Sequence, residues 1–484
     1  MYTQRQLFKI LLIITIIALV SNSCSKTKEL LEPLLEVSKT NLKFNNQDSK
    51  YNVTVRSDEI INVFIDQSWC RVVTGIPVKS AEGYLTTELI VKVNANDETN
   101  ERRASIRVST SSLTQTIAIE QDNKYIINMP SDAVTLASKM TIGWNIGNNL
   151  EATGESFASE TMWGNPKVTK ELIDVVKEAG FNSIRIPCAW NGYIEDHSTY
   201  KIKESWFKRV EEVINYCLEN KMITILNIHW DSGWLENNCV PTKQIENNEK
   251  QHALWTQIAT RFRDYDENLL FAGTNEPNVD NLEQMTVLQS YLQTFIDAVR
   301  TTGGNNSLRN LIIQGPSTDI RKTNELMATL PNDLTENRLI MEIHYYSPWN
   351  FCGLENDESW GNMFYYWGEG YHFGDPVRDA NWGEEEYVKE QFSLIKAQFI
   401  DQNIPVIMGE YGAMKRELNT QEKQHTHDTS RLYFLEYVTQ RAKAVGIIPF
   451  YWDNGDKTTR LFDRSNNTIA DQNTLDALMN GAKQ

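Results

Sequence analysis

The sequence has little positive charge for its length. Its 484 residues include 47 Lys and Arg against 64 Asp and Glu, which gives a net charge of −17 at pH 7. Nucleic acids and anionic membrane surfaces attract basic proteins, so we expect neither as a partner. A chain of this length can form two or three domains with large cores. The composition therefore favours a soluble, exported protein whose ligands are neutral.

Cysteine is scarce as well. The chain has six cysteines and no Cys-x-x-Cys pair, so we expect neither a zinc site nor a disulfide framework. Cys24 belongs to the N-terminal segment, and the remaining five could form two bridges at most. Buried free thiols are the simpler interpretation, and we expect no metal and no cofactor. The five are Cys70, Cys188, Cys217, Cys239 and Cys352.

The N-terminal apolar run, Ile10–Val20, is too short to span a membrane. It follows two basic residues, as in a secretory signal. Cys24 and the polar residues after it resemble a bacterial lipoprotein signal, which implies that residues 1–24 are signal peptide and lipidated anchor. The lipid would then be the only membrane contact, at the outer membrane or cell surface. Ordinary cleavage after Ser23, giving a periplasmic or secreted protein, is the alternative.

Residues 35–122 alternate between apolar and polar side chains and are rich in β-branched residues. Strands of this kind, separated by Asn, Asp, Ser and Gly turns, predict a small antiparallel β-sandwich. We place this immunoglobulin-like domain at residues 30–123 and a linker at residues 124–132. The expected strands are Tyr51–Val55, Ile61–Ile65, Leu89–Val93, Ser105–Val108 and Thr116–Ile119.

The same segment resembles the BACON domain, an immunoglobulin-like module of carbohydrate-active lipoproteins in Bacteroidetes-type bacteria. The resemblance rests on Ser68–Cys70, Asn100–Ile106 and Ile119–Asp122. A glycan-binding role remains open for this domain. Because it has only one Trp, we interpret it as a spacer that lifts the following domain off the membrane.

From residue 133 to residue 484, short apolar runs alternate with amphipathic stretches. Eight such units predict an α/β fold, a (β/α)8 TIM barrel with enlarged loops. The longest gap holds the Trp- and Gly-rich stretch Trp349–Trp382, which we expect to form an active-site wall. The expected strands are Ile142–Ile146, Ser183–Pro187, Ile223–Ile228, Leu269–Gly273, Leu311–Gln314, Leu339–His344, Pro405–Met408 and Ile447–Tyr451.

Two of these strands deliver a glutamate at their carboxyl end. Leu269–Gly273 leads to Glu276, and Pro405–Met408 leads to Glu410. The carboxyl ends of barrel strands meet at the active-site mouth. Paired carboxylates there suggest glycoside hydrolysis, in which one group is the acid/base and the other attacks the sugar or activates water.

The other strand ends deliver polar and aromatic groups, and residues 133–475 together resemble glycoside hydrolase family 5, the cellulase family. The segments that carry the resemblance include Gly143–Asn149, Gly180–Asn182, His229–Asp231, Asn275–Pro277 and Trp452–Gly455. It implies that Glu276 is the general acid/base and Glu410 the nucleophile. It also implies substrate-binding roles for six further residues. Arg185 and Tyr346 would orient the nucleophile, and Asn275 would donate to the sugar 2-hydroxyl. His229 and His344 would line the cleft, and Trp452 would stack beneath the sugar.

A retaining enzyme of this kind should hold its two carboxyl groups ~5–5.5 Å apart. Arg185 would keep Glu410 ionised, and the negative charge of Glu410 would favour the protonated form of Glu276. Arg185 alone could instead be a structural ion-pair partner in the barrel floor. The strand-three His is followed by Trp230, where many relatives of the family carry a second His, and Trp230 and Trp234 are candidate stacking surfaces.

The sequence thus predicts a retaining endo-β-1,4-glucanase, a cellulase that acts as a monomer on cellulosic or mixed-linkage β-glucan. A xyloglucanase or β-mannanase built on the same residues is the first alternative. A non-catalytic glycan-binding surface lipoprotein is the second, and it would be expected to have lost Glu276 or Glu410.

Overall fold

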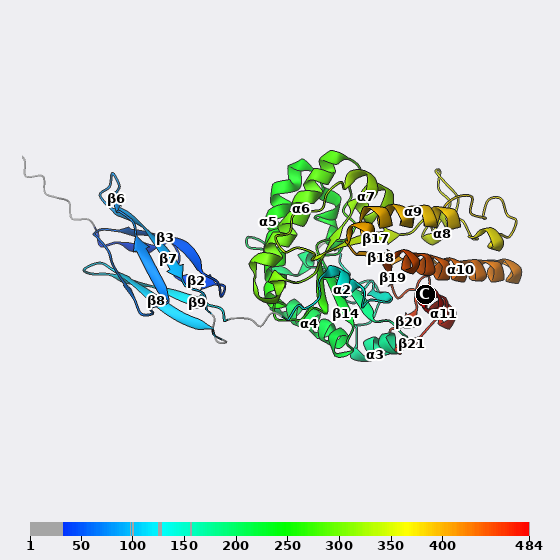
Figure 1. The fold of residues 1–484 in the computed structure, drawn as a ribbon, viewed down its shortest axis with the longest axis horizontal. Coiled ribbons are helices and arrows are strands. Elements are labelled where there is room, and N and C mark those ends of the chain that lie inside the picture. The colour runs from blue at the N-terminus through cyan, green and yellow to red at the C-terminus, as the bar shows by residue number, and fades with distance from the viewer. Residues whose placement is uncertain (1–31, 97, 99–100, 124–127, 155–156, 484) are drawn as a thin grey trace, which may run out of the picture. The chain divides into compact units, whose positions relative to one another are not determined.

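The computed structural model of the chain describes residues 32–483, except 97, 99–100, 124–127 and 155–156. The chain divides into two compact units, residues 1–124 and residues 125–484 (Figure 1). The predicted signal peptide and Cys24 lie outside the described residues. Within the described part, no helix has both the length and the apolar character needed to cross a membrane.

The first unit is a β-sandwich of two sheets. One sheet has the order β1-β3-β7-β5, with β6 paired to β7, and the other has the order β2-β9-β8-β4. Side chains alternate between core and solvent along the long strands, so that Leu89 and Val91 are fully buried. The strands are β1 Leu35–Val37, β2 Asn41–Phe44, β3 Ser49–Ser57, β4 Asn62–Ile65, β5 Cys70–Thr74, β6 Val78–Lys79, β7 Leu85–Val93, β8 Arg102–Ser109 and β9 Thr114–Gln121.

The sequence had suggested a wholly antiparallel sandwich, but one pair of its strands is parallel. Strand β2 pairs with β9 in parallel, with Asn41 opposite Ala118 and Phe44 opposite Gln121. These two strands come from the start and the end of the unit. No hairpin joins them, so no turn imposes the antiparallel direction on the pair.

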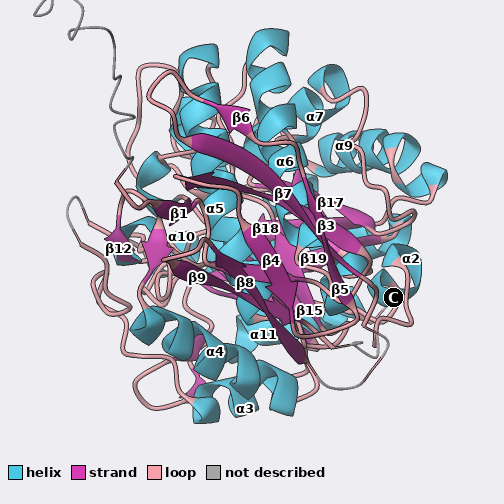
Figure 2. Ribbon diagram, turned by 90° about the vertical axis from the view of Figure 1, so that its left-hand side faces the viewer, coloured by secondary structure: helices cyan, strands magenta, loops and turns pink. Residues whose placement is uncertain are grey.

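The second unit is a closed barrel of eight parallel strands, which the helices surround (Figures 1 and 2). Each of the eight predicted strands is present, with ends that shift by a few residues. The strands are β10 Gly143–Ile146, β11 Ser183–Ile186, β14 Ile223–Asn227, β15 Leu269–Ala272, β16 Leu311–Gln314, β17 Leu339–Tyr345, β18 Val406–Tyr411 and β19 Ile447–Asp453.

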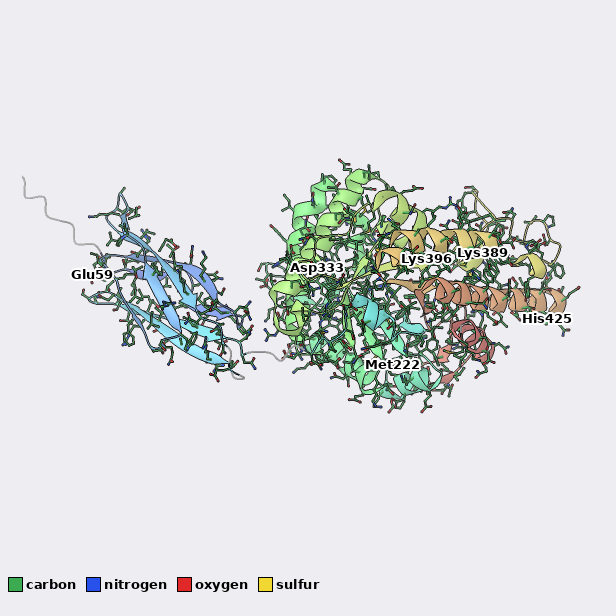
Figure 3. The ribbon with its side chains drawn as sticks, viewed as in Figure 1. Glu59, Met222, Asp333, Lys389, Lys396 and His425 are labelled. Carbon is green, nitrogen blue, oxygen red and sulfur yellow. The ribbon has the colours of Figure 1, made fainter. Side chains whose placement is uncertain are left out.

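Amphipathic helices cover the outside of the barrel. On α9, Val388 and Phe392 are buried, whereas Lys389 and Lys396 point outward (Figure 3). Figure 3 also labels His425, which is exposed near the start of α10. The helices are α3 Lys170–Glu178, α4 Glu204–Glu219, α5 Gln244–Arg261, α6 Leu282–Thr301, α7 Ile320–Leu326, α8 Trp349–Cys352, α9 Glu385–Gln398, α10 Gln421–Val445 and α11 Gln472–Ala482.

The interior of the barrel is packed and is closed at the amino ends of the strands. Inward-facing side chains such as Ile225 and Ile407 form one cluster with Leu136 of the short helix α2, Ala133–Ala137. Because this floor is packed, we look for the active site at the carboxyl ends of the strands, where barrels of this kind carry it. The five cysteines of the described residues are all buried and free, as expected.

Candidate active site

Two carboxylates meet at the carboxyl ends of β15 and β18. Glu276 follows β15, and Glu410 lies within β18. One ligand atom each of Glu276, His344 and Glu410 lies within 4.8 Å of the other two. His344 Nδ1 lies 2.7 Å from Glu276 Oε1 and 3.8 Å from Glu410 Oε2. The Glu276 side chain is 40% exposed and that of Glu410 only 7%, so Glu276 is the more accessible of the two.

A β-bulge places Glu410 beside His344. Along β17 and β18, Ile343 faces Met408 but the next residue, His344, faces Glu410, so Gly409 is the extra residue. Bulges of this kind redirect the side chains that follow them. A Cβ atom on Gly409 would lie only 1.9 Å from Glu342 Oε1. The close approach of Glu342 therefore requires glycine at this position.

Arg185 and Tyr346 both contact Glu410, as the sequence had suggested. Arg185 Nη1 donates to Glu410 Oε1 at 2.8 Å, and the Tyr346 hydroxyl donates to Glu410 Oε2 at 3.1 Å. Arg185 Nη1 also donates to Asn145 Oδ1, and Asn145 Nδ2 donates to the carbonyl of Gly409. The carboxylate of Glu410 and the bulge before it are thus held by the same network.

The expectation that Arg185 keeps Glu410 ionised did not include the effect of burial on this carboxyl group. Burial raises the pKa of Glu410, and the positive charges of His344 and Arg185 oppose that rise. The net direction is upward, because removing a carboxylate from water is costly even beside two cations.

Glu342 is the partner that sequence reasoning missed. It is fully buried on β17, and its Oε1 lies 2.8 Å from Arg185 Nε and 3.3 Å from His344 Nε2. Burial alone would raise the pKa of Glu342, but Arg185 and His344 lower it below its ordinary value. Burial alone would likewise lower the pKa of His344, but Glu410, Glu276 and Glu342 raise it to about 10.

Asn275 is held from two sides. Its Oδ1 accepts from Arg185 Nη2 at 2.8 Å, and its Nδ2 donates to Glu236 Oε2 at 3.4 Å. Glu236 Oε2 also accepts from the main-chain N–H of Glu276 at 3.1 Å. Glu236 lies in the 3-10 turn Glu236–Asn238 after β14. This turn has no strand or helix periodicity, so no sequence pattern pointed to Glu236 as a site residue.

The two glutamates open onto a cavity of about 430 Å³. The rings of His229 and Trp452 lie parallel across 5.8 Å in its lining. His344 is buried and contacts the carboxylates, but it is not among the lining residues, contrary to the expectation that it would line the cleft. The lining includes His229, Trp230, Glu236, Asn275, Glu276, Tyr346, Trp349, Cys352, Glu355, Glu410, Met414, Trp452 and Asn454.

Only the beginning of the Trp349–Trp382 insertion forms a wall of the cavity, through residues from Trp349 to Glu355. Further along, Trp367 is fully buried and packs against Phe434 and Tyr437 of α10. The prediction that the whole insertion forms the wall was therefore wrong, because burial of its aromatic rings against α10 draws it away from the cavity.

The two tryptophans after β14 have different surroundings. Trp230 is 39% exposed and lines the cavity, as a stacking surface would. Trp234 instead donates its Nε1–H to Asp231 Oδ2, and the Lys250 ammonium lies 4.2 Å from the centre of its ring. The face of Trp234 is thus occupied by a neighbouring cation, and Trp230 is the better candidate for a sugar.

The spacing of Glu276, His344 and Glu410 would also suit a metal ion. However, the guanidinium of Arg185 already neutralises Glu410 at 2.8 Å, and a divalent cation would have to enter beside it. The cation and the Arg185 guanidinium would repel each other strongly, because both are positive and the site is buried. The arrangement favours acid/base and nucleophilic chemistry at the two carboxyl groups over metal binding.

Comparison with known proteins agrees with this geometry. Residues 147–458 match the family described as "Cellulase (glycosyl hydrolase family 5)". The chain belongs to glycoside hydrolase family 5. Residues 57–122 match the BACON family, described as "Putative binding domain, N-terminal". The barrel is therefore the catalytic domain of a glycoside hydrolase, and the sandwich is a BACON domain.

The individual relatives include an endo-β-1,4-glucanase and several endoglucanases. A xyloglucan-specific endo-β-1,4-glucanase from Bacteroides ovatus is 33% identical over 99% of this chain and 96% of its own length. Endoglucanase A from Paenibacillus barcinonensis is 35% identical over 72% of this chain and 90% of its own. The solved structure of a Bacteroides ovatus family 5 xyloglucanase with a XXXG heptasaccharide matches with a TM-score of 0.69, at 33% identity over 93% of this chain and all of that one.

The family and these relatives show a glycoside hydrolase of the endo-β-1,4-glucanase type. This finding replaces the hypothesis of a non-catalytic glycan-binding lipoprotein. Both glutamates that such a protein would have been expected to lose are present at the cavity.

Proposed function

We propose that the chain is a retaining endo-β-1,4-glucanase in which Glu276 is the acid/base and Glu410 the nucleophile. The separation of their carboxylate oxygens, within 4.8 Å, carries this proposal. Retaining glycosidases hold the two groups ~5–5.5 Å apart, whereas inverting enzymes need ~6.5–9.5 Å to admit water between carboxylate and sugar. The short separation supports direct attack by one carboxylate on the sugar.

In the first step, Glu410 attacks the anomeric carbon while Glu276 gives its proton to the departing glycosidic oxygen. The bond to the leaving sugar breaks, and an ester between the glucosyl unit and Glu410 forms. In the second step Glu276 takes a proton from water, which attacks the anomeric carbon and releases Glu410. Two inversions give net retention.

The surrounding residues fit supporting roles in these steps. Arg185 and Tyr346 fix the two oxygens of Glu410, so that the free lone pair is aimed before the substrate arrives. Asn275 is placed to donate to the sugar 2-hydroxyl, a contact that strengthens in the transition state. Trp452 and His229 present parallel rings to the sugar at the cleavage point.

Substitution and product analysis test these roles. Glu276→Ala should lower turnover of a β-glucan by roughly 10²–10⁴-fold, the usual size of an acid–base contribution. With an activated aryl β-cellobioside, added azide should restore turnover of this variant and give the β-glycosyl azide. Glu410→Gln should not respond to azide in this way. An α-configured first product from the unmodified enzyme would contradict retention.

We further propose xyloglucan as the polysaccharide substrate, with linear cellulosic or mixed-linkage glucan as the second candidate. The xyloglucan-specific relative from Bacteroides ovatus supports this, because it matches across both units of the chain. The exposed rings of Trp230 and Trp349 at the cavity offer stacking surface beyond the cleavage point. A linear glucan has no side-chain sugars, so it would need fewer stacking surfaces beside its main chain.

A panel of polysaccharides distinguishes the candidates. We expect kcat/KM on xyloglucan to exceed that on lichenan, carboxymethylcellulose and glucomannan by at least ~10-fold, about 1.4 kcal/mol of selective transition-state binding. A higher value on lichenan or carboxymethylcellulose would support the linear substrate. A higher value on glucomannan would support a mannanase.

We also propose that the enzyme is exported and anchored through a lipid on Cys24, with the BACON domain as spacer. The support is the N-terminal sequence alone. Expression of the full chain in a Gram-negative host, with radiolabelled fatty acid, should label the wild type and not Cys24→Ala. Equal labelling of both, or of neither, would contradict lipidation at Cys24.

A further inference from the structure

A third carboxyl group lies beside the catalytic pair. Glu236 lines the same cavity as Glu276 and Glu410, yet its side chain is almost fully enclosed, with the residue 7% exposed. Its Oε2 accepts from two donors, the main-chain N–H of Glu276 and the side-chain amide of Asn275. It comes from the turn after β14, so it links that loop to the end of β15.

Glu236 has no cation to neutralise it. Across the described part of the chain, no Lys, Arg or His forms an ion pair with this carboxyl group. Burial, with the negative charge of Glu276 next in size, raises the pKa of Glu236 to about 8. At neutral pH the group is therefore largely a neutral acid, and it accepts hydrogen bonds without adding a negative charge to the site.

The two contacts of Glu236 fix the orientation of Asn275. Arg185 can only donate, so it selects the Oδ1 side of the Asn275 amide. Glu236 Oε2 accepts one hydrogen of Nδ2. The second Nδ2 hydrogen is then the one left for a sugar hydroxyl in the cavity. The same oxygen of Glu236 also accepts from the main-chain N–H of Glu276, the proposed proton donor.

We propose that Glu236 is a positioning residue of the glycosidase reaction: it aims the Asn275 amide at the substrate 2-hydroxyl and fixes the main chain of Glu276. This inference rests on the proposed function. Because the 2-hydroxyl contact strengthens in the transition state, Glu236 acts on kcat more than on KM. It does so without itself touching the reacting atoms.

The test compares an aryl β-cellobioside with its analogue that lacks the 2-hydroxyl at the reacting glucosyl unit. For the wild type, the ratio of the two kcat/KM values should be roughly 100-fold or more, since 2-hydroxyl contacts contribute strongly in the transition state. Glu236→Ala should reduce that ratio by about 10-fold through kcat, the equivalent of one lost hydrogen bond. Glu236→Gln, which keeps a neutral acceptor, should stay within about 3-fold of the wild-type ratio.

Two further variants make the test specific. Glu151 is also buried and accepts from main-chain N–H groups, of Asn148 and Asn149, but it does not line the cavity. Glu151→Ala should therefore leave the ratio unchanged even where it lowers the melting temperature. If Glu236→Ala does not fold, Glu236→Leu fills the same space without an acceptor and should show the same reduced ratio.

The outcomes separate this inference from the proposed function. A folded Glu236→Ala or Glu236→Leu that keeps the wild-type ratio would overturn the role of Glu236 alone. A wild-type enzyme that hydrolyses both substrates at equal rates would overturn the role of Asn275 as well. A reduced ratio in Glu151→Ala would show that the effect is general destabilisation and would also overturn the inference.

Discussion

The charge of His344 should make the stability of the barrel depend on pH in a defined direction. His344 is 6% exposed and is enclosed by Glu276, Glu342 and Glu410. Burial alone would lower its pKa, but Glu410 and the two contacting carboxyls raise it from 6.5 to about 10. Between pH 6.5 and about pH 10, His344 therefore keeps a proton in the folded protein that it has released in the unfolded chain.

The contribution of His344 to the unfolding free energy depends on pH because protonation is linked to folding. Since the folded-state pKa exceeds the unfolded-state pKa, the contribution is complete below pH 6.5 and is lost as the pH rises towards 10. One pKa unit corresponds to ~1.4 kcal/mol, so the change from 6.5 to about 10 is equivalent to ~5 kcal/mol of unfolding free energy. Relaxation of the neighbouring carboxyls reduces this, and we expect ~3–5 kcal/mol.

Urea unfolding followed by Trp fluorescence measures this contribution. Twelve of the 13 Trp residues lie in the barrel, because Trp69 is the only one before residue 133. The difference in unfolding free energy between wild type and His344→Gln should fall by the expected amount from pH 6.5 to 10. An equal pH dependence in the two proteins would refute the reasoning.

His427→Gln is the matched control. His427 is equally buried, but burial lowers its pKa to about 4, and its contact with the carbonyl of Tyr365 only partly opposes this. It is therefore neutral in both the folded and the unfolded state above pH 6.5. His427→Gln should change stability by a constant amount over the same pH range.

Three further predictions concern the shape of the site. Tyr346→Phe, which removes the donor to Glu410 Oε2, should lower kcat/KM by ~10-fold with little change in KM, measured on an aryl cellobioside. Gly409→Ala, whose Cβ would displace Glu342, should lose activity and melt several degrees lower; unchanged melting would contradict the tight fit. Trp349→Ala should raise KM for polysaccharide, whereas Trp360→Ala, exposed but away from the cavity lining, should not.

The strand ends could be predicted from sequence because their arrangement follows from topology. In a parallel barrel every strand delivers its carboxyl end to the same rim. Strand direction alone therefore predicted that Glu276 and Glu410 would meet at one rim, and the two carboxylates do lie close together there. The contacts of Arg185 and Tyr346 with Glu410 were expected from the family resemblance, and both are present.

Glu342 and Glu236 escaped prediction for different reasons. Glu342 interrupts an apolar strand two residues before His344, and residues two apart on a strand share a face. A charged residue at that position was a usable signal for a partner of His344. Glu236 had no such signal, because only the folded turn brings it to Asn275. The path of the insertion after Trp349 depended in the same way on tertiary packing against α10.

The buried charges around the Glu276–Glu410 pair suit the charge transfers of the proposed mechanism. Arg185 and His344 bring two positive charges, and Glu342 balances one of them. The proposed mechanism starts with one ionised and one protonated carboxyl in the catalytic pair, and with that arrangement the charges of these side chains sum to zero. In the proposed mechanism, Glu410 loses its charge when it becomes an ester, and Glu276, having given up its proton, carries a negative charge instead. The total charge beside Arg185 and His344 stays constant through both steps. By this mechanism the enzyme would move a proton and a glucosyl unit without burying an additional charge.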